Sequence, residues 1–352
     1  MLTIDQAIEM AYQRRASDIH ITAGLPVMMR VNGALLMADA DMLTPELTKK
    51  TIEPMLTDHH KATLKQFGEV DFSYSLKSVG RCRVNVYLQR SAFACAIRLI
   101  SDVIPKPEQL GLNDSVVDLA NRKRGLVLVT GPTGSGKSTT LASIIDVINK
   151  KHKEHIITLE DPIEYLHKHN KSMVNQREIG HDSKSFAGAL RAALRQDPDV
   201  ILVGEMRDNE TIATAITAAE TGHLVFSTLH TIGAAPTIDR VIDVFPPHQQ
   251  QQIRIQLASV LECVISQQLM PNAEGTGRVA AFEVMHANSG IKNLIREQKV
   301  HMIPSIIQTN KRNGMCTMDD SLYELYSARR ISGTTAISFA QDPAAMEKKV
   351  LV

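Results

Sequence analysis

The sequence predicts an α/β protein of two domains, on the evidence of its length and of two different hydrophobic patterns. At 352 residues the chain has room for two domains of ordinary size. Residues 1–100 alternate short extended runs with helical segments, which is typical of an antiparallel sheet with helices on one face. Residues 112–352 alternate continuous apolar runs with helices, which indicates a parallel sheet buried on both faces.

The amino-terminal domain is predicted to begin with a helix whose apolar face carries Ile4, Ala7, Ile8 and Ala11. Helical segments are also expected within 45–67. The predicted strands lie at 18–22, 27–32, 70–76, 81–88 and 92–100. Pro105, Pro107 and Gly111 then interrupt both patterns, so residues 101–111 are predicted to form the linker.

The second domain is predicted to contain a parallel sheet followed by a helical part. Its expected strands lie at 126–130, 156–159, 200–203 and 224–228, and two of its expected helices at 138–149 and 183–195. From about residue 247 to 352 the sequence is expected to be mostly helical. One apolar helix face in that part is predicted from the spacing of Ile253, Leu257, Val260, Leu261 and Val264.

The segment Gly131-Pro132-Thr133-Gly134-Ser135-Gly136-Lys137-Ser138 fits the pattern G-x-x-x-x-G-K-[ST] and directly follows a predicted strand. Glycines in this pattern let backbone N–H groups turn inward around a phosphate, and the following helix adds a partial positive charge. Lys137 is expected to reach the β- and γ-phosphates and Ser138 to ligate Mg²⁺. The sequence therefore predicts that residues 131–139 form a nucleotide site that binds ATP. Thr139 is the last residue of this segment.

Carboxylates follow two of the predicted strands at the edge where α/β sheets bind ligands. They are Glu160, Asp161 and Glu164 after the strand at 156–159, and Glu205 after the strand at 200–203. One of the first three could instead cap the next helix. Gly204 stands where a metal-binding Asp is usual, so Glu205 is expected to act on Mg²⁺ directly or through water. Such groups can orient an attacking water for hydrolysis.

Two histidines flank the predicted strand at 224–228. His230 follows its carboxyl end, where the γ-phosphate is expected, whereas His223 precedes it. A lone histidine more often has a structural than a functional role. The position of His230 makes it the stronger candidate of the two.

Composition limits the classes of function. The net charge is +1, aromatic residues make up 4% of the chain and Trp is absent, so dedicated nucleic-acid binding is not expected. The four cysteines form no Cys-x-x-Cys pair, which argues against a zinc ribbon. No run approaches the length of a membrane span and no signal peptide is evident, so the chain is expected to be cytoplasmic.

Several segments together resemble the ATPases of type II and type IV secretion, and among them the type IV pilus retraction (twitching motility) ATPases. The matching segments are 131–140, 158–164, 175–178, 195–199, 203–208 and 221–231. Residues 16–20 resemble the family's amino-terminal opening. Arg296 lies in the segment 293–297, which resembles a carboxyl-terminal retraction motif. Gly204 is itself usual in this family.

The resemblance implies a PAS-like α+β amino-terminal domain followed by a RecA-like P-loop ATPase domain, with ATP bound between domains. It gives Glu164 the role of general base, Glu205 that of the Walker B carboxylate and His230 that of a γ-phosphate sensor, although the two glutamates could exchange roles. Arginines of the amino-terminal sheet are expected to reach the phosphates. The candidates are Arg81, Arg83 and Arg98, any one of which could instead be an ordinary surface arginine.

The resemblance also implies a homohexamer that hydrolyses ATP to power pilus retraction. Its expected partners are an inner-membrane pilus platform protein, other pilus machinery and a second retraction ATPase, so that the ring would be peripheral at the inner face of the cytoplasmic membrane. Two other classes stay open. A RecA-like nucleic-acid motor would be stimulated by DNA, and a nucleotide-gated structural component would bind ATP without hydrolysing it.

Overall fold

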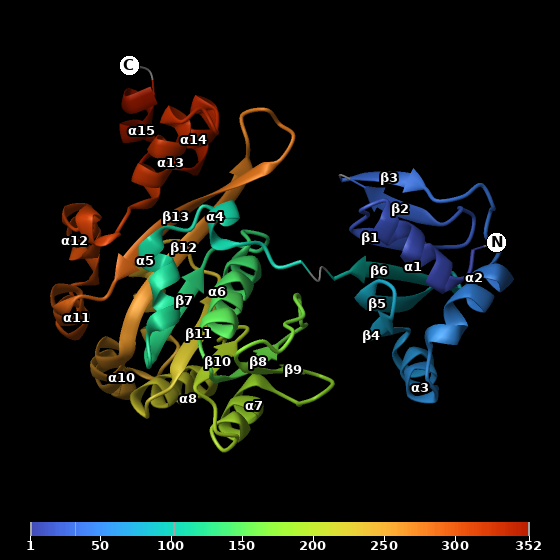
Figure 1. Cartoon of the computed structure of the whole chain (residues 1–352), viewed down its shortest axis with the longest axis horizontal. Coiled ribbons are helices and arrows are strands. Elements are labelled where there is room, and N and C mark those ends of the chain that lie inside the picture. The colour runs from blue at the N-terminus through green and yellow to red at the C-terminus, as the bar shows by residue number, and fades with distance from the viewer. Residues whose placement is uncertain (1, 32, 101–102, 351–352) are drawn as a thin grey trace. The chain divides into compact units, whose positions relative to one another are not determined.

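The computed structural model describes residues 2–31, 33–100 and 103–350. The chain divides into two compact units, Met1–Val103 and Ile104–Val352 (Figure 1). The division falls inside the linker predicted at 101–111. Residues 101 and 102 of that linker lie outside the described residues, and Pro107–Leu110 form the short helix α4.

The first unit is a six-stranded antiparallel sheet in the order β3-β2-β1-β6-β5-β4. Its strands are β1 (Asp18–Ile21), β2 (Met28–Val31), β3 (Ala34–Met37), β4 (Glu69–Leu76), β5 (Gly80–Gln89) and β6 (Ala92–Leu99). Its helices are α1 (Ile4–Gln13), α2 (Pro45–Ile52) and α3 (Asp58–Phe67). The predicted mixed domain is confirmed, and β3 is the strand that the sequence patterns did not indicate.

The two faces of this sheet differ because side chains alternate along each strand. On β5, Cys82, Val84 and Val86 are buried in one core with the apolar face of α1. Arg81 and Arg83 point to the opposite face, and Arg83 is exposed. The helices therefore cover one face, and the arginine-bearing face lies on the other side of the sheet.

The second unit contains a seven-stranded sheet in the order β13-β12-β7-β11-β10-β8-β9. Its strands are β7 (Gly125–Thr130), β8 (His155–Glu160), β9 (Met173–Glu178), β10 (Val200–Val203), β11 (Leu224–Leu229), β12 (Leu261–Pro271) and β13 (Arg278–His286). All pairs are parallel except β12 with β13. The parallel core predicted from the apolar runs is confirmed. Because β7 and β10 are buried along their full lengths, they show no alternation in the sequence.

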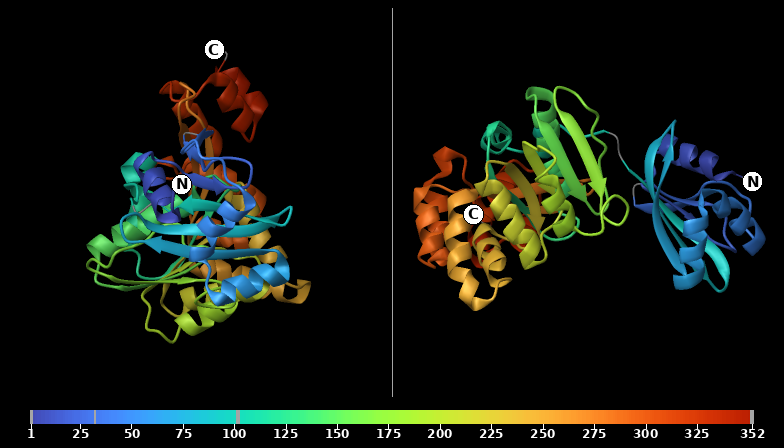
Figure 2. Two further views of the ribbon diagram at one scale, coloured as in Figure 1. Left: turned by 90° about the vertical axis from the view of Figure 1, so that its right-hand side faces the viewer. Right: turned by 90° about the horizontal axis from the view of Figure 1, so that it is seen from below.

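Helices cover both faces of this sheet (Figures 1 and 2). One layer and its core include α5 (Asp114–Val117) and α6 (Lys137–Lys151). The other layer comprises α7 (Phe186–Ala193), α8 (Asn209–Glu220), α9 (Ala234–Asp243), α10 (Pro247–Val260), α11 (Ser289–Arg296) and α12 (Ile303–Thr309). A third core joins the ends of β12 and β13 to α13 (Met318–Ser327), α14 (Gly333–Phe339) and α15 (Pro343–Val350).

The prediction that residues 247–352 are mostly helical is wrong for β12 and β13. Helix α10 ends at Val260, and Leu261 and Val264 belong to β12 rather than to the helix face predicted for them. The reason is that β12 pairs in parallel with β7 and is buried on both faces. The apolar residues of such a strand need not alternate with polar ones, and the spacing of Leu261 and Val264 therefore also fits a helix.

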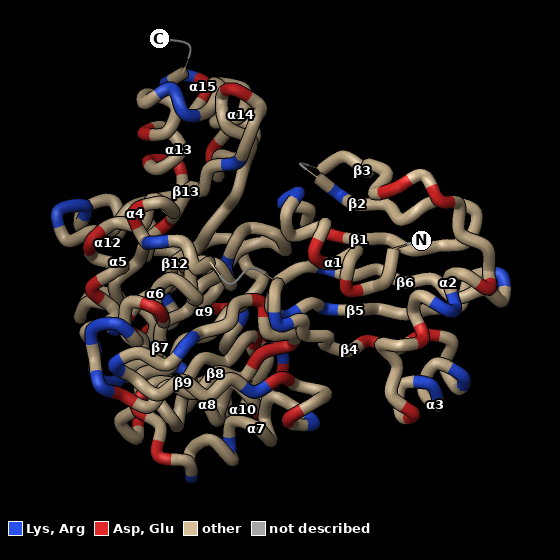
Figure 3. Tube along the Cα trace, turned by 45° about the vertical axis from the view of Figure 1, so that its right-hand side comes forward, with Lys and Arg blue, Asp and Glu red and all other residues tan. Residues whose placement is uncertain are grey.

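Among the described residues, no helix is long and apolar enough to cross a membrane. Lys and Arg are interspersed with Asp and Glu along the trace of both units (Figure 3). This mixture agrees with the net charge of +1.

Candidate functional site

The glycine-rich loop lies where the fold favours an anion site, between the carboxyl end of β7 and the start of α6. Gly131, Gly134 and Gly136 have φ angles of 141°, 79° and 91°, which side chains other than glycine rarely adopt. Helix α6 begins at Lys137, directly after the loop. The loop therefore presents its backbone to the same space as the positive end of the helix dipole.

Two of these glycines are also required by close packing against β12. A Cβ atom on Gly131 would lie 2.1 Å from the backbone oxygen of Gln267, and one on Gly136 would lie 2.8 Å from its Nε2. The hydroxyl of Thr140 donates to Gln267 Oε1 over 2.8 Å. Gln267 thus packs against the loop and binds the first turn of α6. No sequence signal marks this residue, because it lies far along the chain on the strand that was predicted as helix.

Lys137 is buried within the loop. Its Nζ donates to the carbonyl oxygens of Gly131 (2.8 Å) and Pro132 (3.0 Å). Burial lowers the pKa of Lys137, and the carboxylates of Glu164 and Glu205 act in the opposite direction. The ammonium group therefore interacts with both of the glutamates that the sequence singled out.

The remaining loop residues fit a triphosphate. Ser135 is buried and its hydroxyl has no hydrogen-bond partner within the described part of the chain. Pro132, Thr133 and Gly134 are exposed, and Ser138 is half-buried at the start of α6. The hydroxyl of Thr139 lies 3.0 Å from that of Tyr165, so it is tied to the neighbouring acidic loop. An unpartnered hydroxyl inside a glycine cradle is what a bound phosphate would satisfy.

The acidic loop follows β8, as predicted. Glu160 ends the strand and accepts hydrogen bonds from Thr158 (2.6 Å) and Gln176 (3.1 Å). Burial raises the pKa of Glu160, and these two hydrogen bonds oppose that effect. Asp161 and Glu164 are exposed. The Glu160 carboxylate therefore forms hydrogen bonds within the protein, whereas the Glu164 carboxylate is available to a ligand.

Strand β9 holds the acidic loop in place. The backbone N–H of Ile163 donates to Glu178 over 3.1 Å. The amide of Gln176 donates to the carbonyl of Tyr165 (2.9 Å) and accepts from the N–H of His167 (2.8 Å). The segment 175–178 matched a motif of the family, but its residues alone indicated no role. These contacts supply one, because they position the segment that carries Glu164.

Glu205 follows β10 through Gly204, whose Cβ would come within 3.1 Å of the Leu159 carbonyl oxygen. The tight approach of β8 therefore favours glycine at this position. The Glu205 carboxylate lies 2.9 Å from Arg207 Nε and 3.6 Å from His230 Nε2. The structure thus brings His230 to Glu205. Arg207 was part of a recognised motif, but its contact with Glu205 was not predicted.

The two histidines that flank β11 lie at opposite ends of the strand. His230 is exposed at the carboxyl end, next to Glu205. His223 precedes the strand, and its Nδ1 lies 2.9 Å from the carbonyl oxygen of Ala218 at the end of α8. The expectation of a site role for His223 is therefore not supported by its position, since parallel strands place their amino and carboxyl ends at opposite edges.

The remaining candidates belong to other elements of the chain. Arg81 and Arg83 are on β5 and Arg98 is on β6, where Arg83 and Arg98 are cross-strand partners. They contact Ser73 (2.8 Å), Asp71 (3.7 Å) and Asp18 (2.9 Å), in that order. Arg296 is exposed at the last position of α11, whose apolar residues are buried in the core of the second unit.

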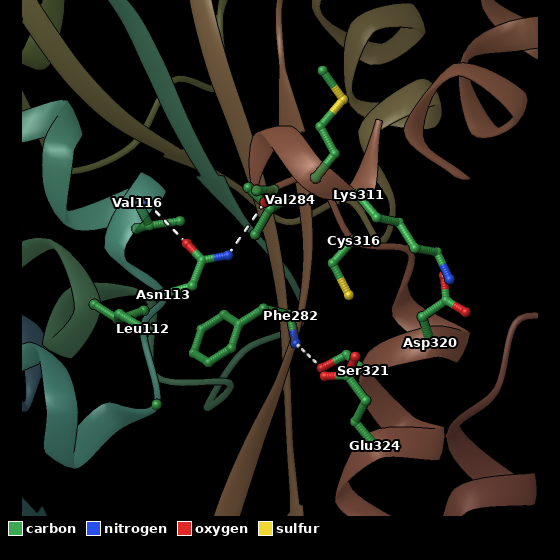
Figure 4. A pocket seen from close by; sticks show the side chains of 13 residues that line it. Leu112, Asn113, Val116, Phe282, Val284, Lys311, Cys316, Asp320, Ser321 and Glu324 are labelled. Atoms are coloured by element: carbon green, nitrogen blue, oxygen red, sulfur yellow. Dashed lines mark hydrogen bonds and ion pairs between the residues drawn. The ribbon is translucent and has the colours of Figure 1, made fainter. Parts of the chain in front are cut away.

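A cavity of about 700 Å³ adjoins the glycine-rich loop and has Gly136 and Thr139 in its wall. Other lining residues include Gln267, Arg278, Phe282 and Arg330. A smaller cavity of about 260 Å³ shares Phe282 with it (Figure 4). In the smaller cavity Lys311 and Asp320 form a 2.8 Å ion pair, so their charges satisfy each other. Of these two cavities, the larger is the one with residues of the glycine-rich loop in its wall.

A parallel sheet with a glycine-rich loop, a buried lysine and carboxylates at one edge defines a RecA-like P-loop ATPase domain, here preceded by a separate α+β unit. The chain belongs to the family described as type II/IV secretion system protein, whose pattern matches residues 1–320.

Within that family the chain is similar to pilus retraction motors. It is 45% identical to the type IV pilus retraction ATPase PilT of Pseudomonas aeruginosa, covering 97% of this chain and 99% of the relative. It is also 45% identical to a twitching motility protein of Neisseria gonorrhoeae, covering 94% and 90%. A crystal structure of the pilus retraction motor PilT with bound ADP matches with a TM-score of 0.93 and 51% identity over 99% of this chain and 100% of that one. The resemblance indicated by the sequence motifs is confirmed.

Proposed function

We propose that the chain is a motor ATPase that hydrolyses ATP to power type IV pilus retraction. The observation that carries the proposal is the convergence of the Lys137 loop, Glu164, Glu205 and His230 at one edge of the second unit's sheet. The similarity to PilT proteins over almost the whole chain gives this ATPase site its cellular task.

The chain's own groups can bind each part of ATP. Backbone N–H groups of residues 133–138 and the ammonium of Lys137 bind the phosphates. To do so, the ammonium gives up its hydrogen bonds to the carbonyl oxygens of Gly131 and Pro132. Ser138 and Glu205 hold Mg²⁺, which when bound neutralises charge on the phosphate oxygens. The cavity of about 700 Å³ beside Gly136 accommodates the base and ribose.

The contacts of the two glutamates favour Glu164 as the general base. Glu205 is paired with Arg207 and approached by His230. A general base needs a carboxylate oxygen that is free to accept a hydrogen bond from the attacking water. Among the described residues, the exposed Glu164 carboxylate has no hydrogen bond or ion pair. Glu164 then orients and deprotonates the attacking water, while Glu205 acts at the metal and His230 contacts the γ-phosphate.

The assembly and its partners are proposed from the family. The chain forms a homohexamer, and Arg81, Arg83 and Arg98 supply positive charge to the phosphates. The ring acts on an inner-membrane pilus platform protein at the inner face of the cytoplasmic membrane, with a second retraction ATPase as a further partner. Arg296, exposed on α11, is a candidate contact for that machinery.

The test is steady-state ATP turnover on the full chain, together with its mass in solution, for the native protein, Glu164→Gln and Glu205→Gln. Loss of the general base is expected to reduce turnover roughly 10²–10⁴-fold. Glu154→Gln is the matched control. Glu154 is a carboxylate just before β8 that pairs with Lys123 over 2.7 Å, and the turnover of this variant should match the native value.

Three results would contradict the proposal. Tight ATP binding without turnover in the native chain would make the nucleotide a structural switch. Turnover that depends on added DNA would favour a nucleic-acid motor. Undiminished turnover in Glu164→Gln, with turnover lost in Glu205→Gln, would transfer the role of base to Glu205.

A further inference from the structure

Glu283 is a buried carboxylate on β13, outside the nucleotide site, and no cation pairs with it among the described residues. It is 5% exposed. Its Oε1 accepts a hydrogen bond from the backbone N–H of Ala234 (2.7 Å). Its Oε2 accepts from the N–H of Met318 (3.3 Å) and from the side-chain amide of Gln341 (3.1 Å). Because burying an unpaired charge is costly, these three donors must stabilise it.

Two of the three donors are the first residues of helices. Ala234 begins α9 and Met318 begins α13. The first N–H groups of a helix have no partner within the helix, and the helix dipole favours a negative charge at that end. One carboxylate therefore caps two helices that are far apart in the sequence. A displacement of the start of one helix would move the carboxylate that also binds the start of the other.

Helix α9 is the direct continuation of the loop that starts with His230. Gly233 lies at its N-cap position and has no side chain with which to cap it. Ser266 accepts from the N–H of Gly233 over 2.8 Å. Ser266 on β12 is the cross-strand partner of Glu283, so this pair of side chains binds two successive N–H groups at the end of the loop.

The same loop is connected to the nucleotide site by hydroxyl groups. Thr237 on α9 lies 2.7 Å from the hydroxyl of Thr231, next to His230. The Thr237 hydroxyl donates to the carbonyl oxygen of Gly233 (2.7 Å) and lies 3.4 Å from the hydroxyl of Thr130, which immediately precedes the glycine-rich loop. A shift of His230 on contact with a γ-phosphate would therefore act on the start of α9.

On the other side, Glu283 is bound to the carboxyl-terminal helices, which pack against the start of β13 and lie together in Figure 1. Gln341 is fixed within them, because the N–H groups of Gln341 and Asp342 donate to the Asp319 carboxylate over 2.7 and 3.0 Å. Helices α13, α14 and α15 share one apolar core. Displacement of Glu283 would therefore move these helices as a group rather than one residue.

We propose that Glu283 is a positioning residue that couples the His230 loop to helices α13–α15, so that these helices respond to the γ-phosphate of the bound nucleotide. This inference depends on the proposed ATP site with His230 as its phosphate sensor. Glu283 itself does not contact the nucleotide. It sets the relative position of two helix starts, and the nucleotide state biases that position.

The experiment is hydrogen–deuterium exchange on the full chain with Mg²⁺ and either a non-hydrolysable ATP analogue or ADP. In the native protein, peptides covering 228–238 and 316–350 are both expected to exchange at least about threefold more slowly with the analogue. In Glu283→Gln the difference should remain at 228–238 and be lost at 316–350. Glutamine keeps the shape of the side chain, but an NH₂ group replaces one carboxylate oxygen. This NH₂ group then faces N–H donors and has no acceptor among these three partners.

The matched control is Glu262→Gln. Glu262 lies near the start of β12 and approaches Arg122 (3.7 Å) and Lys292 (3.8 Å). This variant should keep both differences. If Glu283→Gln does not fold, Gln341→Ala removes one of the three donors and leaves both helix caps, and the difference at 316–350 should then decrease at least twofold.

The proposal is overturned if 316–350 shows no nucleotide-dependent difference in the native protein, or if a folded Glu283→Gln keeps that difference in full. Titration with a fluorescent ATP analogue distinguishes the two levels of failure. A chain that does not bind it contradicts the ATP site and the coupling together. A chain that binds and responds only at 228–238 contradicts the coupling alone.

Discussion

The two sheets of this protein expose functional groups in different ways. The sheet of the second unit is mainly parallel, and helices cover both of its faces. The sheet of the first unit is antiparallel, with its helices in one core and charged side chains on the opposite face. In the second unit only residues at the ends of the strands can contact a ligand. In the first unit a whole face of the sheet can do so.

This difference explains the distribution of the candidate residues. Glu164, Glu205 and His230 all follow the carboxyl ends of strands, where loops replace the ladder of the sheet. Arg83 and Arg98 are instead cross-strand neighbours in the middle of a face. The site at the edge of the second sheet requires precise backbone positions in the glycine-rich loop. The face of the first sheet instead carries arginine side chains that already form ion pairs. The two regions should therefore respond differently to substitution.

The largest effect is expected for Gly131→Ala at the edge. Its Cβ would lie 2.1 Å from the backbone oxygen of Gln267 and its φ of 141° is unfavourable for alanine. Overpacking and backbone strain together should lower the free energy of unfolding by roughly 2–6 kcal/mol. Urea unfolding followed by circular dichroism measures this, since the chain has no Trp.

Gly222→Ala is the matched control for that substitution. Gly222 also has a positive φ, 110°, but a Cβ atom there would meet nothing within 4 Å, so only the strain of roughly 1–3 kcal/mol should appear. Equal losses for the two variants would show that packing against Gln267 does not constrain the loop.

A smaller effect is expected for Arg98→Ala on the open face. Its ion pair with Asp18 is 2.9 Å long, but the arginine side chain is 67% exposed, so the free energy of unfolding should fall by less than about 1 kcal/mol. If the arginines supply charge to the phosphates, ATP turnover should still fall at least about tenfold. Lys61→Ala is the control, because Lys61 also forms a surface ion pair, with Glu53 on the helical side. Native turnover in Arg98→Ala and also in Arg83→Ala would leave these two residues with a structural role only.

The smallest effect concerns the pH dependence of the acidic loop. Burial lowers the pKa of His167 from 6.5 to about 4, and its Nδ1 has no hydrogen-bond partner among the described residues. Between these values the unfolded chain binds a proton that the folded chain does not. The free energy of unfolding is therefore unaffected by this titration well above pH 6.5 and decreases as the pH falls towards 4. Between pH 7.5 and 5.5 the expected decrease is about 1 kcal/mol.

The measurement for His167 is the difference in urea stability at pH 7.5 and 5.5, compared between the native chain and His167→Gln. The variant should lose less stability on acidification. His248→Gln, at an exposed position in α10, should behave like the native chain. An unchanged pH dependence in His167→Gln would show that the imidazole is not protected in the folded state.

Much of the fold could be predicted because its signals are local. The helix with Ile4, Ala7, Ile8 and Ala11 on one face forms as α1, and all four side chains are buried. The run at 200–203 forms β10 with the predicted bounds. Periodicity fails for β12, since a strand buried on both faces has no alternation to distinguish it from a helix.

The sequence by itself determined the glycine-rich loop, because its chemistry resides in consecutive residues whose backbone angles and helix start are fixed locally. It also placed Glu164, Glu205 and His230 at the ends of strands. Only the tertiary structure decided that Gln267 packs against the loop, that Arg207 pairs with Glu205, and that Glu283 lies between the starts of two helices. The contacts of Gln267 and Glu283 join residues distant in the chain, and such pairing depends on strand order and packing, which the hydrophobic pattern of one sequence does not encode position by position.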